Sequence, residues 1–349
     1  SISELEKGGY PHFMLKEIFE QPRTLRDCIR GRVSADGKHV VLSGVLDNKE
    51  RFLDAHRILI VACGTSWHAA LIGKHLFEDM CRIPVEVEYA SEFRYRNPVV
   101  SDKDVLIAMS QSGETADTLA AVRIARAKGA QVFAVTNCVG SRITRESDGV
   151  LYVRANMEIS VAATKSFLAQ IACLMLIAMF LGQKKGRLTT RQVNSLYYDL
   201  RETPSQIEDI LQDTAEIEKA AKLIAKAHSV MYVGRGIGST ICYEGALKLK
   251  EISYLHAEAY PAGELKHGPI ALLDETVPVV AVVTDSPTRM QTLSNVQEIL
   301  ARKSHVVAVA TEGDEEAARI ADCVLYVPPC KDWCSAITAS VPLQLLARY

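Results

Sequence analysis

The sequence predicts an α/β protein with two doubly wound, flavodoxin-like parallel sheets joined by a helical connection. Short apolar runs alternate with helical stretches in both halves of the chain. Strands that are apolar throughout and alternate with helices are typical of parallel sheets covered on both faces. The segment 184–228 contains no such run, and its charge-rich helical patterns separate the two halves. A length of 349 residues also exceeds the usual size of one domain.

These patterns divide the chain into four parts. We predict a helical lead-in at 1–50, a first sheet domain at 51–190, a helical connection at 191–221 and a second sheet domain at 222–349. The lead-in has apolar positions at helical spacing, and Pro22 is expected to break its helix.

Five runs predict the strands of the first sheet: 57–65, 85–93, 105–110, 132–137 and 150–153. Helices are expected from the end of the first run to about residue 81 and at 114–128. The most apolar stretch, 167–182, contains Gln170 and is shorter than the roughly 20 residues that cross a bilayer. It therefore predicts a buried core helix rather than a membrane span.

The strand pattern resumes after the helical connection, in which Pro204 is expected at the start of a helix. The second set of predicted strands is 229–233, 277–284, 305–311 and 323–327. Both halves repeat one plan of strand, glycine turn and helix.

Charge and cysteine content narrow the function classes. The chain has 40 Lys and Arg against 42 Asp and Glu, without a basic stripe, which argues against nucleic acid as a partner. Nine cysteines are scattered without a CxxC pair, which suggests reduced thiols in the cytoplasm. The GRGIGS turn departs from GxGxxG, and GxxxxGK[ST] is missing, so a nucleotide cofactor is not expected.

Two hydroxyl-rich loops follow predicted strands of the first half. The loop at 110–115 offers Ser110, Gln111, Ser112 and Thr115, and the loop at 63–66 offers Thr65 and Ser66. Free N–H groups at a helix start attract anions, and neighbouring parallel strands place such loops at one sheet edge. The pair predicts a phosphate cradle; the alternative is that each hydroxyl merely caps its helix.

A second group of charged residues follows the run 229–233. Ser239 or Thr240 is expected to cap a helix in which Glu244, Lys248 and Glu251 share one face. These residues could equally form a solvated stripe of ion pairs. The stretch 256–269 shows neither helical nor strand period and is predicted to be a functional loop carrying His267.

The stretches EGALKLKEISYLHAEAYPAGELKHGP, HFMLKEIFEQP, CGTS and SQSGETADTL resemble the isomerase half of the glutamine–fructose-6-phosphate aminotransferases, which consists of two sugar isomerase (SIS) domains. The resemblance implies that Glu251 moves a proton between C1 and C2 of the sugar, with Lys248 beside it. It also implies that His267 opens the sugar ring and reaches in from the neighbouring subunit of a homodimer.

The resemblance assigns the sugar phosphate to the 110–115 loop, with Thr65 nearby. The remaining implied substrate contacts are Ser66, Val161, Ala163 and Glu244. Relatives commonly have a serine at position 163, so one sugar hydrogen bond, worth about 0.5–1.5 kcal/mol, is expected to be missing here. Fructose 6-phosphate, glucose 6-phosphate and glucosamine 6-phosphate are the implied ligands, and no metal or redox cofactor is required.

The resemblance further suggests an isomerase fragment whose full enzyme adds an N-terminal glutaminase domain and a C-terminal tail. Two other functions stay open. A non-catalytic sugar-phosphate sensor would need neither Glu251 nor His267, and a stand-alone phosphosugar isomerase or deaminase would have two such domains without the GELKHGP match.

Overall fold

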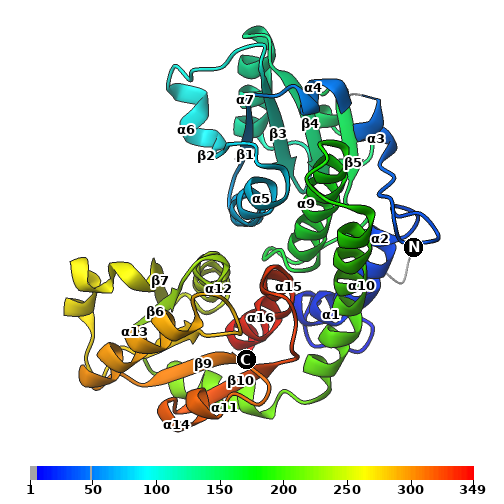
Figure 1. The fold of residues 1–349 in the computed structure, drawn as a ribbon. Helices are drawn as coiled ribbons and strands as arrows, with labels where there is room; N and C mark the ends of the chain where they lie inside the picture. Colours follow the sequence, from blue (N-terminus) through cyan, green and yellow to red (C-terminus); the bar gives the residue numbers. More distant parts are fainter. Residues whose placement is uncertain (1–5, 48) are drawn as a thin grey trace. The chain divides into compact units, whose positions relative to one another are not determined.

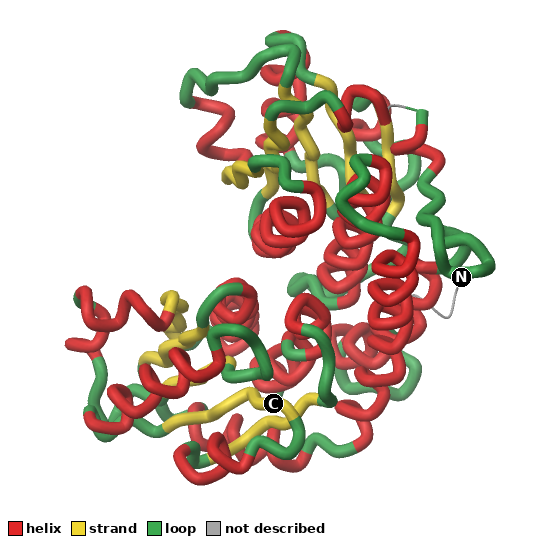
Figure 2. Tube along the Cα trace, in the orientation of Figure 1, coloured by secondary structure: helices red, strands yellow, loops and turns green. Residues whose placement is uncertain are grey.

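The computed structural model describes residues 6–47 and 49–349. The chain folds into two compact units, which are described separately (Figure 1). Unit 1 comprises Ser1–Pro22, Ile159–Thr164 and Glu202–Tyr349, and unit 2 comprises Arg23–Glu158 and Lys165–Arg201. Each unit contains one five-stranded sheet whose strands all run parallel (Figure 2).

The sheet of unit 2 has the strand order β2-β1-β3-β4-β5. Its strands are β1 Arg57–Ala62, β2 Val85–Tyr89, β3 Asp104–Ser110, β4 Gln131–Thr136 and β5 Gly149–Tyr152. The order reverses between β1 and β3, which is the switch point at which flavodoxin-like sheets bind ligands. The predicted doubly wound fold class is confirmed for this half of the chain.

Two layers of helices cover this sheet. Helices α5 (Thr65–Cys81) and α9 (Lys165–Lys184) pack together on one face. Helices α6 (Ala90–Tyr95) and α7 (Ala116–Ala127) contribute Phe93, Leu119 and Val122 to an apolar cluster on the other. Further helices are α2 Gln21–Ile29, α3 Ser43–Leu46, α4 Lys49–Leu53 and α8 Arg142–Arg145.

Helix α9 contains the most apolar run of the sequence. With 20 residues it is long and apolar enough to pass a test for membrane spans based on length and composition, so shortness alone does not exclude one. However, 94% of its most apolar window is buried inside the fold, mainly against α5. The predicted core helix is therefore confirmed by its burial.

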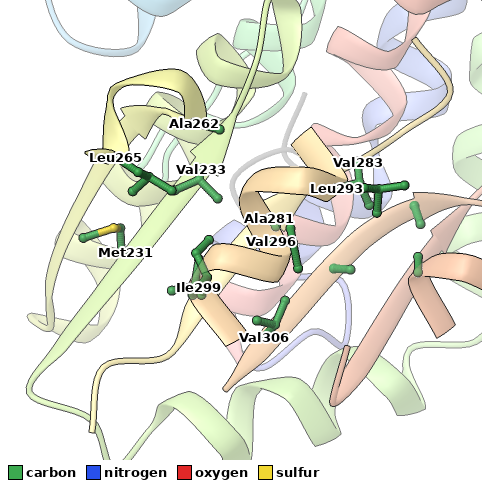
Figure 3. Close-up of a cluster of buried hydrophobic side chains, with 14 of the residues drawn as sticks. Met231, Val233, Ala262, Leu265, Ala281, Val283, Leu293, Val296, Ile299 and Val306 are labelled. Carbon is green, nitrogen blue, oxygen red and sulfur yellow. The ribbon is translucent and has the colours of Figure 1, made fainter. Parts of the chain in front are cut away.

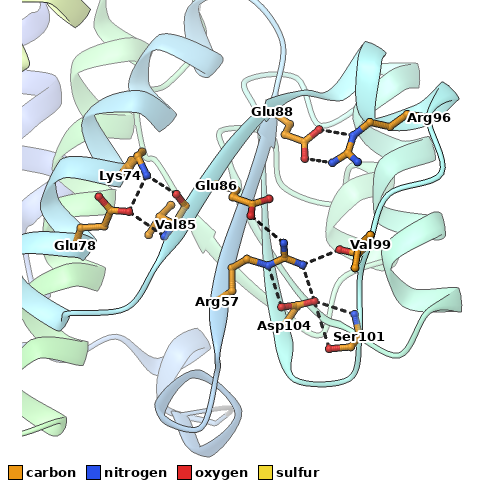
Figure 4. A network of polar contacts seen from close by, with 10 residues as sticks. All are labelled: Arg57, Lys74, Glu78, Val85, Glu86, Glu88, Arg96, Val99, Ser101 and Asp104. Atoms are coloured by element: carbon orange, nitrogen blue, oxygen red, sulfur yellow. Dashed lines mark hydrogen bonds and ion pairs between the residues drawn. The ribbon is translucent and has the colours of Figure 1, made fainter.

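A polar network ties the amino ends of strands in unit 2 (Figure 4). The Arg57 guanidinium donates to both carboxylate oxygens of Asp104, at 3.1 and 3.0 Å, and to Glu86 at 2.9 Å. Ser101 N also donates to Asp104 at 2.8 Å. Burial acts to raise the pKa of Asp104, but the hydrogen bonds from Arg57 and Ser101 outweigh it and hold the pKa below its usual range.

The sheet of unit 1 repeats the topology of unit 2, with the order β10-β9-β8-β6-β7. Its strands are β6 Ser229–Gly234, β7 His256–Pro261, β8 Val279–Val282, β9 Val306–Thr311 and β10 Cys323–Val327. The order reverses between β6 and β8. This second doubly wound sheet confirms the fold class for the rest of the chain.

Helices also cover both faces of this second sheet. On one face, α13 (Arg289–Ala301) contributes Leu293, Val296 and Ile299 to an apolar cluster that also contains Met231 and Val233 of β6 (Figure 3). Helix α12 (Ile237–Ser253) packs against β6, β7 and β8. The remaining helices of the unit are α1 Phe13–Phe19, α11 Ala215–Ile224, α14 Glu315–Ile320, α15 Asp332–Thr338 and α16 Ser340–Arg348.

The predicted helical connection contains α10 (Thr190–Gln212), whose first part belongs to unit 2 and whose end belongs to unit 1. The prediction that Pro204 starts a helix is wrong, because it lies inside α10. An interior proline costs a helix about 3 kcal/mol. Burial of Leu200 and Ile207 on either side of it explains why the helix continues.

The predicted strand 277–284 was four residues too long, since β8 spans only Val279–Val282. Two other strand predictions continued past the end of the strand. Strand β1 ends at Ala62, because Gly64 adopts φ 58° and starts the turn into α5. Strand β2 ends at Tyr89, and the next six residues form α6, whose Ala90 and Phe93 are buried one turn apart. In both places a strand-like composition continued past the point at which the backbone turns.

Candidate active site

The two hydroxyl-rich loops lie at the switch point of the unit 2 sheet. Strand β3 ends at Ser110, and the neighbouring strand β1 leads through Gly64 to Thr65. Because β1 and β3 pair in parallel, both loops emerge at the carboxyl edge of the sheet. The predicted neighbourhood of the two loops is therefore confirmed.

The 110–115 loop is held by its own hydroxyl groups. Ser110 Oγ lies 2.9 Å from Thr115 Oγ1 and accepts a hydrogen bond from Gly113 N at 3.0 Å. Gly113 has φ 67°, and a Cβ there would lie 2.1 Å from Ser141 Oγ, so only glycine fits. Thr115 is the N-cap of α7 but makes no side-chain cap, so the capping alternative does not account for its hydroxyl. Gln111 and Ser112 are half-buried beside them.

In the second loop, the hydroxyl of Ser66 already takes part in a hydrogen bond within the protein. Ser66 is buried, and its Oγ accepts a hydrogen bond from Gln170 Nε2 of α9 at 3.0 Å. Gln170 entered the sequence analysis only as a polar interruption of an apolar run. Thr65, at the start of α5, is half-buried.

In unit 1, the three charged residues of α12 form a buried cluster. Lys248 Nζ lies 2.6 Å from Glu251 Oε2 and 3.4 Å from Glu244 Oε1. The side chains of Lys248 and Glu244 are each 1% exposed, whereas that of Glu251 is 33% exposed. The alternative of a solvated stripe is therefore wrong, and the predicted shared face is confirmed.

The cluster keeps its lysine charged. Burial acts to lower the pKa of Lys248, but the carboxylates of Glu244 and Glu251 outweigh it and raise the pKa above its usual value. Two carboxylates thus share one ammonium group. Glu251 is the member that reaches solvent, so it can exchange a proton with a bound molecule while Glu244 stays buried.

The start of α12 differs from the prediction. Its N-cap is Gly236, with φ 56°, and neither Ser239 nor Thr240 caps the helix, because both lie inside its first turn. Ser239 Oγ instead donates to Gly236 O at 2.7 Å. Gly64 before α5 has nearly the same backbone conformation, with ψ −132° against −129° for Gly236. Both units therefore use the same glycine turn.

The predicted loop at 256–269 is partly wrong. Residues His256–Pro261 form the edge strand β7, followed by the 3-10 helices Ala262–His267 and Pro269–Leu272. Among the described strands, β7 lies at the end of the sheet and pairs with β6 alone. Its side chains are therefore less tightly packed and need not be apolar, which is why the sequence shows only a weak strand period. His267 ends the first 3-10 helix and is exposed.

Helix α13 and β6 hold the segment that carries His267. Lys266 pairs with Glu298 of α13 at 2.8 Å. The Arg235 guanidinium donates to Asn295 Oδ1 at 3.0 Å and lies against Gly263, where an added Cβ would come within 3.1–3.3 Å of it. Sequence reasoning missed Arg235, whose only signal was its place in the GRGIGS turn.

A cavity of about 490 Å³ in unit 1 brings together residues far apart in the sequence. Glu251 lies on its wall, and so does Val161, whose side chain is 96% exposed. Ala163 is half-buried two residues further on. The other polar residues that line the cavity were not predicted from the sequence; they are His12, Ser160, Tyr254 and Arg348.

Among residues 6–47 and 49–349, no three His, Cys, Asp or Glu side chains are grouped so that they could hold a metal ion.

Comparisons with known proteins show the family to which the chain belongs. The SIS domain family matches residues 51–180 and 223–349. A glutamine–fructose-6-phosphate aminotransferase (isomerizing) from Bacteroides thetaiotaomicron is 51% identical over 348 residues, and one from Thermus thermophilus is 46% identical over 347. The alignments cover 100% and 99% of this chain but only 57% of each relative.

Solved structures of related proteins also match this chain over nearly its whole length. The C-terminal domain of glucosamine-fructose-6-phosphate aminotransferase from Francisella tularensis superposes with a TM-score of 0.92 at 36% identity, covering 98% of this chain and 96% of that one. A glucosamine-6-phosphate deaminase from Thermotoga maritima shares the fold, with a TM-score of 0.74 and 24% identity.

Proposed function

Because this chain belongs to the SIS domain family and, within it, to the C-terminal isomerase halves of glutamine–fructose-6-phosphate aminotransferases, we propose that it performs the isomerase part of glucosamine 6-phosphate synthesis. Ammonia, released from glutamine by a glutaminase domain of the full-length enzyme, condenses with the C2 carbonyl of fructose 6-phosphate, and water leaves. A proton then moves from C1 to C2 and yields glucosamine 6-phosphate. The relatives described above are longer than this chain, which spans 57% of their length.

The pairing of Lys248 with Glu251 on the wall of a cavity gives this proposal its strongest support. An isomerisation of this kind needs one base that removes a proton from a carbon and returns it to the next. Glu251 takes this role because its carboxylate is partly exposed and lies 2.6 Å from the Lys248 ammonium group, which orients it. Glu244 completes the cluster from the buried side and keeps Lys248 in place.

The phosphate binds, in this proposal, to the loop Ser110–Thr115, with Thr65 and Ser66 beside it. Hydroxyl groups and the N–H groups of a helix start can bind the phosphate dianion even though the loop carries no fixed positive charge. Binding energy from the phosphate then positions the reacting carbons. Val161 and Ala163 contact the sugar itself.

Ring opening requires an acid and base for the anomeric oxygen, and His267 is the candidate. It is exposed on unit 1, so it is free to act in the site of a neighbouring subunit. We accordingly propose that the protein is a homodimer. We also propose that it acts in the cytoplasm, without a nucleic acid partner or a membrane span. The domain boundaries 51–190 and 222–349 also stay a prediction.

A ligand soak tests the location of the site. Crystals soaked with fructose 6-phosphate or glucose 6-phosphate should show the phosphate within hydrogen-bond distance of Ser110, Ser112 and Thr115. A sugar phosphate found only at the corresponding turn 234–239 of the other sheet would overturn the assignment. A non-catalytic sensor would bind the same sugars, and isomerisation of fructose 6-phosphate by the wild type separates an enzyme from it. Formation of glucosamine 6-phosphate from fructose 6-phosphate and ammonia separates the proposed function from a stand-alone isomerase.

A further inference from the structure

A carboxylate of helix α1 binds the backbone of the segment that leads to Val161 and Ala163. Glu17 Oε1 accepts a hydrogen bond from Ile159 N at 2.6 Å and from Ser160 N at 3.2 Å. Glu17 Oε2 lies 3.3 Å from the same Ser160 N. Both ends of one carboxylate are thus engaged with two consecutive amides, 142 and 143 residues further along the chain.

Because Glu17 is buried, forming this contact removes its carboxylate from water at a cost in free energy. The residue is only 2% exposed, and a carboxylate that leaves water must recover its lost solvation from strong hydrogen bonds. Hydrogen bonds to a charged acceptor are shorter and about twice as strong as neutral ones. Two of them on adjacent amides fix both the position and the direction of the backbone at that point.

The segment held by Glu17 has no regular structure of its own to hold it. Residues 159 and 160 lie in neither a helix nor a strand. The six residues Ile159–Thr164 belong to unit 1, although the chain on both sides of them belongs to unit 2. A short irregular segment with such neighbours needs an anchor, and α1 supplies one from within the same unit.

The anchored residues line the cavity that contains Glu251. Ile159, Ser160 and Val161 form part of its wall, and His12, Phe13 and Met14 at the start of α1 form another part. Helix α1 therefore both shapes the cavity and holds the backbone that faces it. We propose that Glu17 is a positioning residue, which sets the Ile159–Thr164 segment for sugar binding without touching the sugar; the role in sugar binding rests on the proposed function.

The direct test is amide hydrogen exchange in the protein as its gene encodes it. Ile159 and Ser160 should exchange slowly in the wild type, because Glu17 is the acceptor described for both amides. In a Glu17→Gln variant the same two amides should exchange at least about tenfold faster, because the amide side chain lacks the charge and one of the two acceptors. Exchange at the rate of an unprotected peptide in the wild type would overturn the proposal, whatever the protein catalyses.

A kinetic comparison tests the role in sugar binding. Glu17→Gln should raise the KM for fructose 6-phosphate about tenfold and leave kcat within about threefold, since ground-state and transition-state binding lose the same contact. Glu20→Gln is the matched control, because Glu20 lies three residues further on, 3.6 Å from Lys16 Nζ, and the acceptor of the Ile159 and Ser160 amides is Glu17 instead. Its KM should stay at the wild-type value.

The failures of the two proposals are distinguishable. If the wild type does not isomerise the sugar, the proposed function is wrong while the exchange result still judges the anchor. If the wild type is active and folded Glu17→Gln keeps the wild-type KM, or loses kcat alone, the positioning role is wrong.

Discussion

Lys248 Nζ lies 2.6 Å from the Glu251 carboxylate, inside a helix face where the lysine side chain is 1% exposed. Glu244 approaches the same ammonium group from the buried side at 3.4 Å. The charge of Lys248 thus stabilises a buried carboxylate and an accessible one at once. This relationship links the stability of α12 to the chemistry that we assign to Glu251.

Lys248→Met should destabilise the protein strongly. The substitution leaves Glu244 buried without its cation, and an uncompensated buried charge costs about 3–5 kcal/mol. Urea unfolding monitored by circular dichroism measures the loss. Lys250→Met is the control, because Lys250 is 41% exposed and lies 3.8 Å from Glu258. The double variant Glu244→Gln with Lys248→Met should recover part of the stability, and equal losses for Lys248→Met and Lys250→Met would contradict the account.

Thr115→Val should weaken the binding of sugar phosphates. The change removes a hydroxyl that lies 2.9 Å from Ser110 Oγ and that we assign to the phosphate, and a hydrogen bond to a charged group contributes about 1.5–3 kcal/mol. Calorimetric titration with glucose 6-phosphate should show a Kd increase of about tenfold or more. Thr118→Val, one turn along α7, removes a buried hydroxyl for which the described residues provide no partner, and should leave Kd unchanged.

Asp104→Asn should destabilise the protein at neutral pH and make little difference in acid. The pKa of Asp104 is lower in the folded protein than in the unfolded chain, so its stabilising contribution is present above the unfolded value of about 3.9 and is lost as pH falls through the folded value. Urea unfolding at pH 7 and at a series of acidic pH values should show a deficit of about 1–3 kcal/mol at pH 7 that shrinks as the pH falls. Asp102→Asn, two residues earlier and exposed, is the control. A deficit that persists at low pH would mean that ionisation of Asp104 is not its source.

Mixed subunits test the role of His267. His267→Ala and Glu251→Gln chains should each be inactive, and hybrid dimers formed from both should regain part of the activity, because one of their sites combines two intact residues. Subunit exchange is followed by mass spectrometry of differently labelled chains. Complete exchange without recovered activity would place both residues in a site built by one subunit.

The sequence predicted the two sheets well because parallel strands covered on both faces are nearly continuous apolar runs. Strand β3, from Asp104 to Ser110, is buried along its whole length and was found almost to the residue. Strand β7 was missed because it lies at the edge, where only Ala257 is fully buried. Pro204 misled the helix prediction because local propensity cannot register the burial of residues on both sides of it.

The site was predicted unevenly for a related reason. Helical spacing placed Glu244, Lys248 and Glu251 on one face, but it could not tell a buried cluster from a solvated one, since burial depends on what packs against the helix. Spacing gave no sign of the roles of Glu17 and His12, because Glu17 binds and His12 faces segments that are far away in the sequence. Resemblance to a family supplied roles for Glu251 and His267 that spacing alone does not provide.

The central claim is that Glu251 is the base of a sugar-phosphate isomerisation, and its most direct test is the rate of Glu251→Gln. Conversion of fructose 6-phosphate to glucose 6-phosphate by the full-length protein is measured with a coupled glucose 6-phosphate dehydrogenase assay, with Glu258→Gln on the exposed face of β7 as control. We expect kcat of Glu251→Gln to fall by about 10²–10⁴, with KM little changed, because the substitution keeps size and hydrogen bonding but removes the base. Equal rates for the wild type and Glu251→Gln would remove Glu251 from the mechanism, and a wild type without measurable conversion would favour a sugar-phosphate sensor.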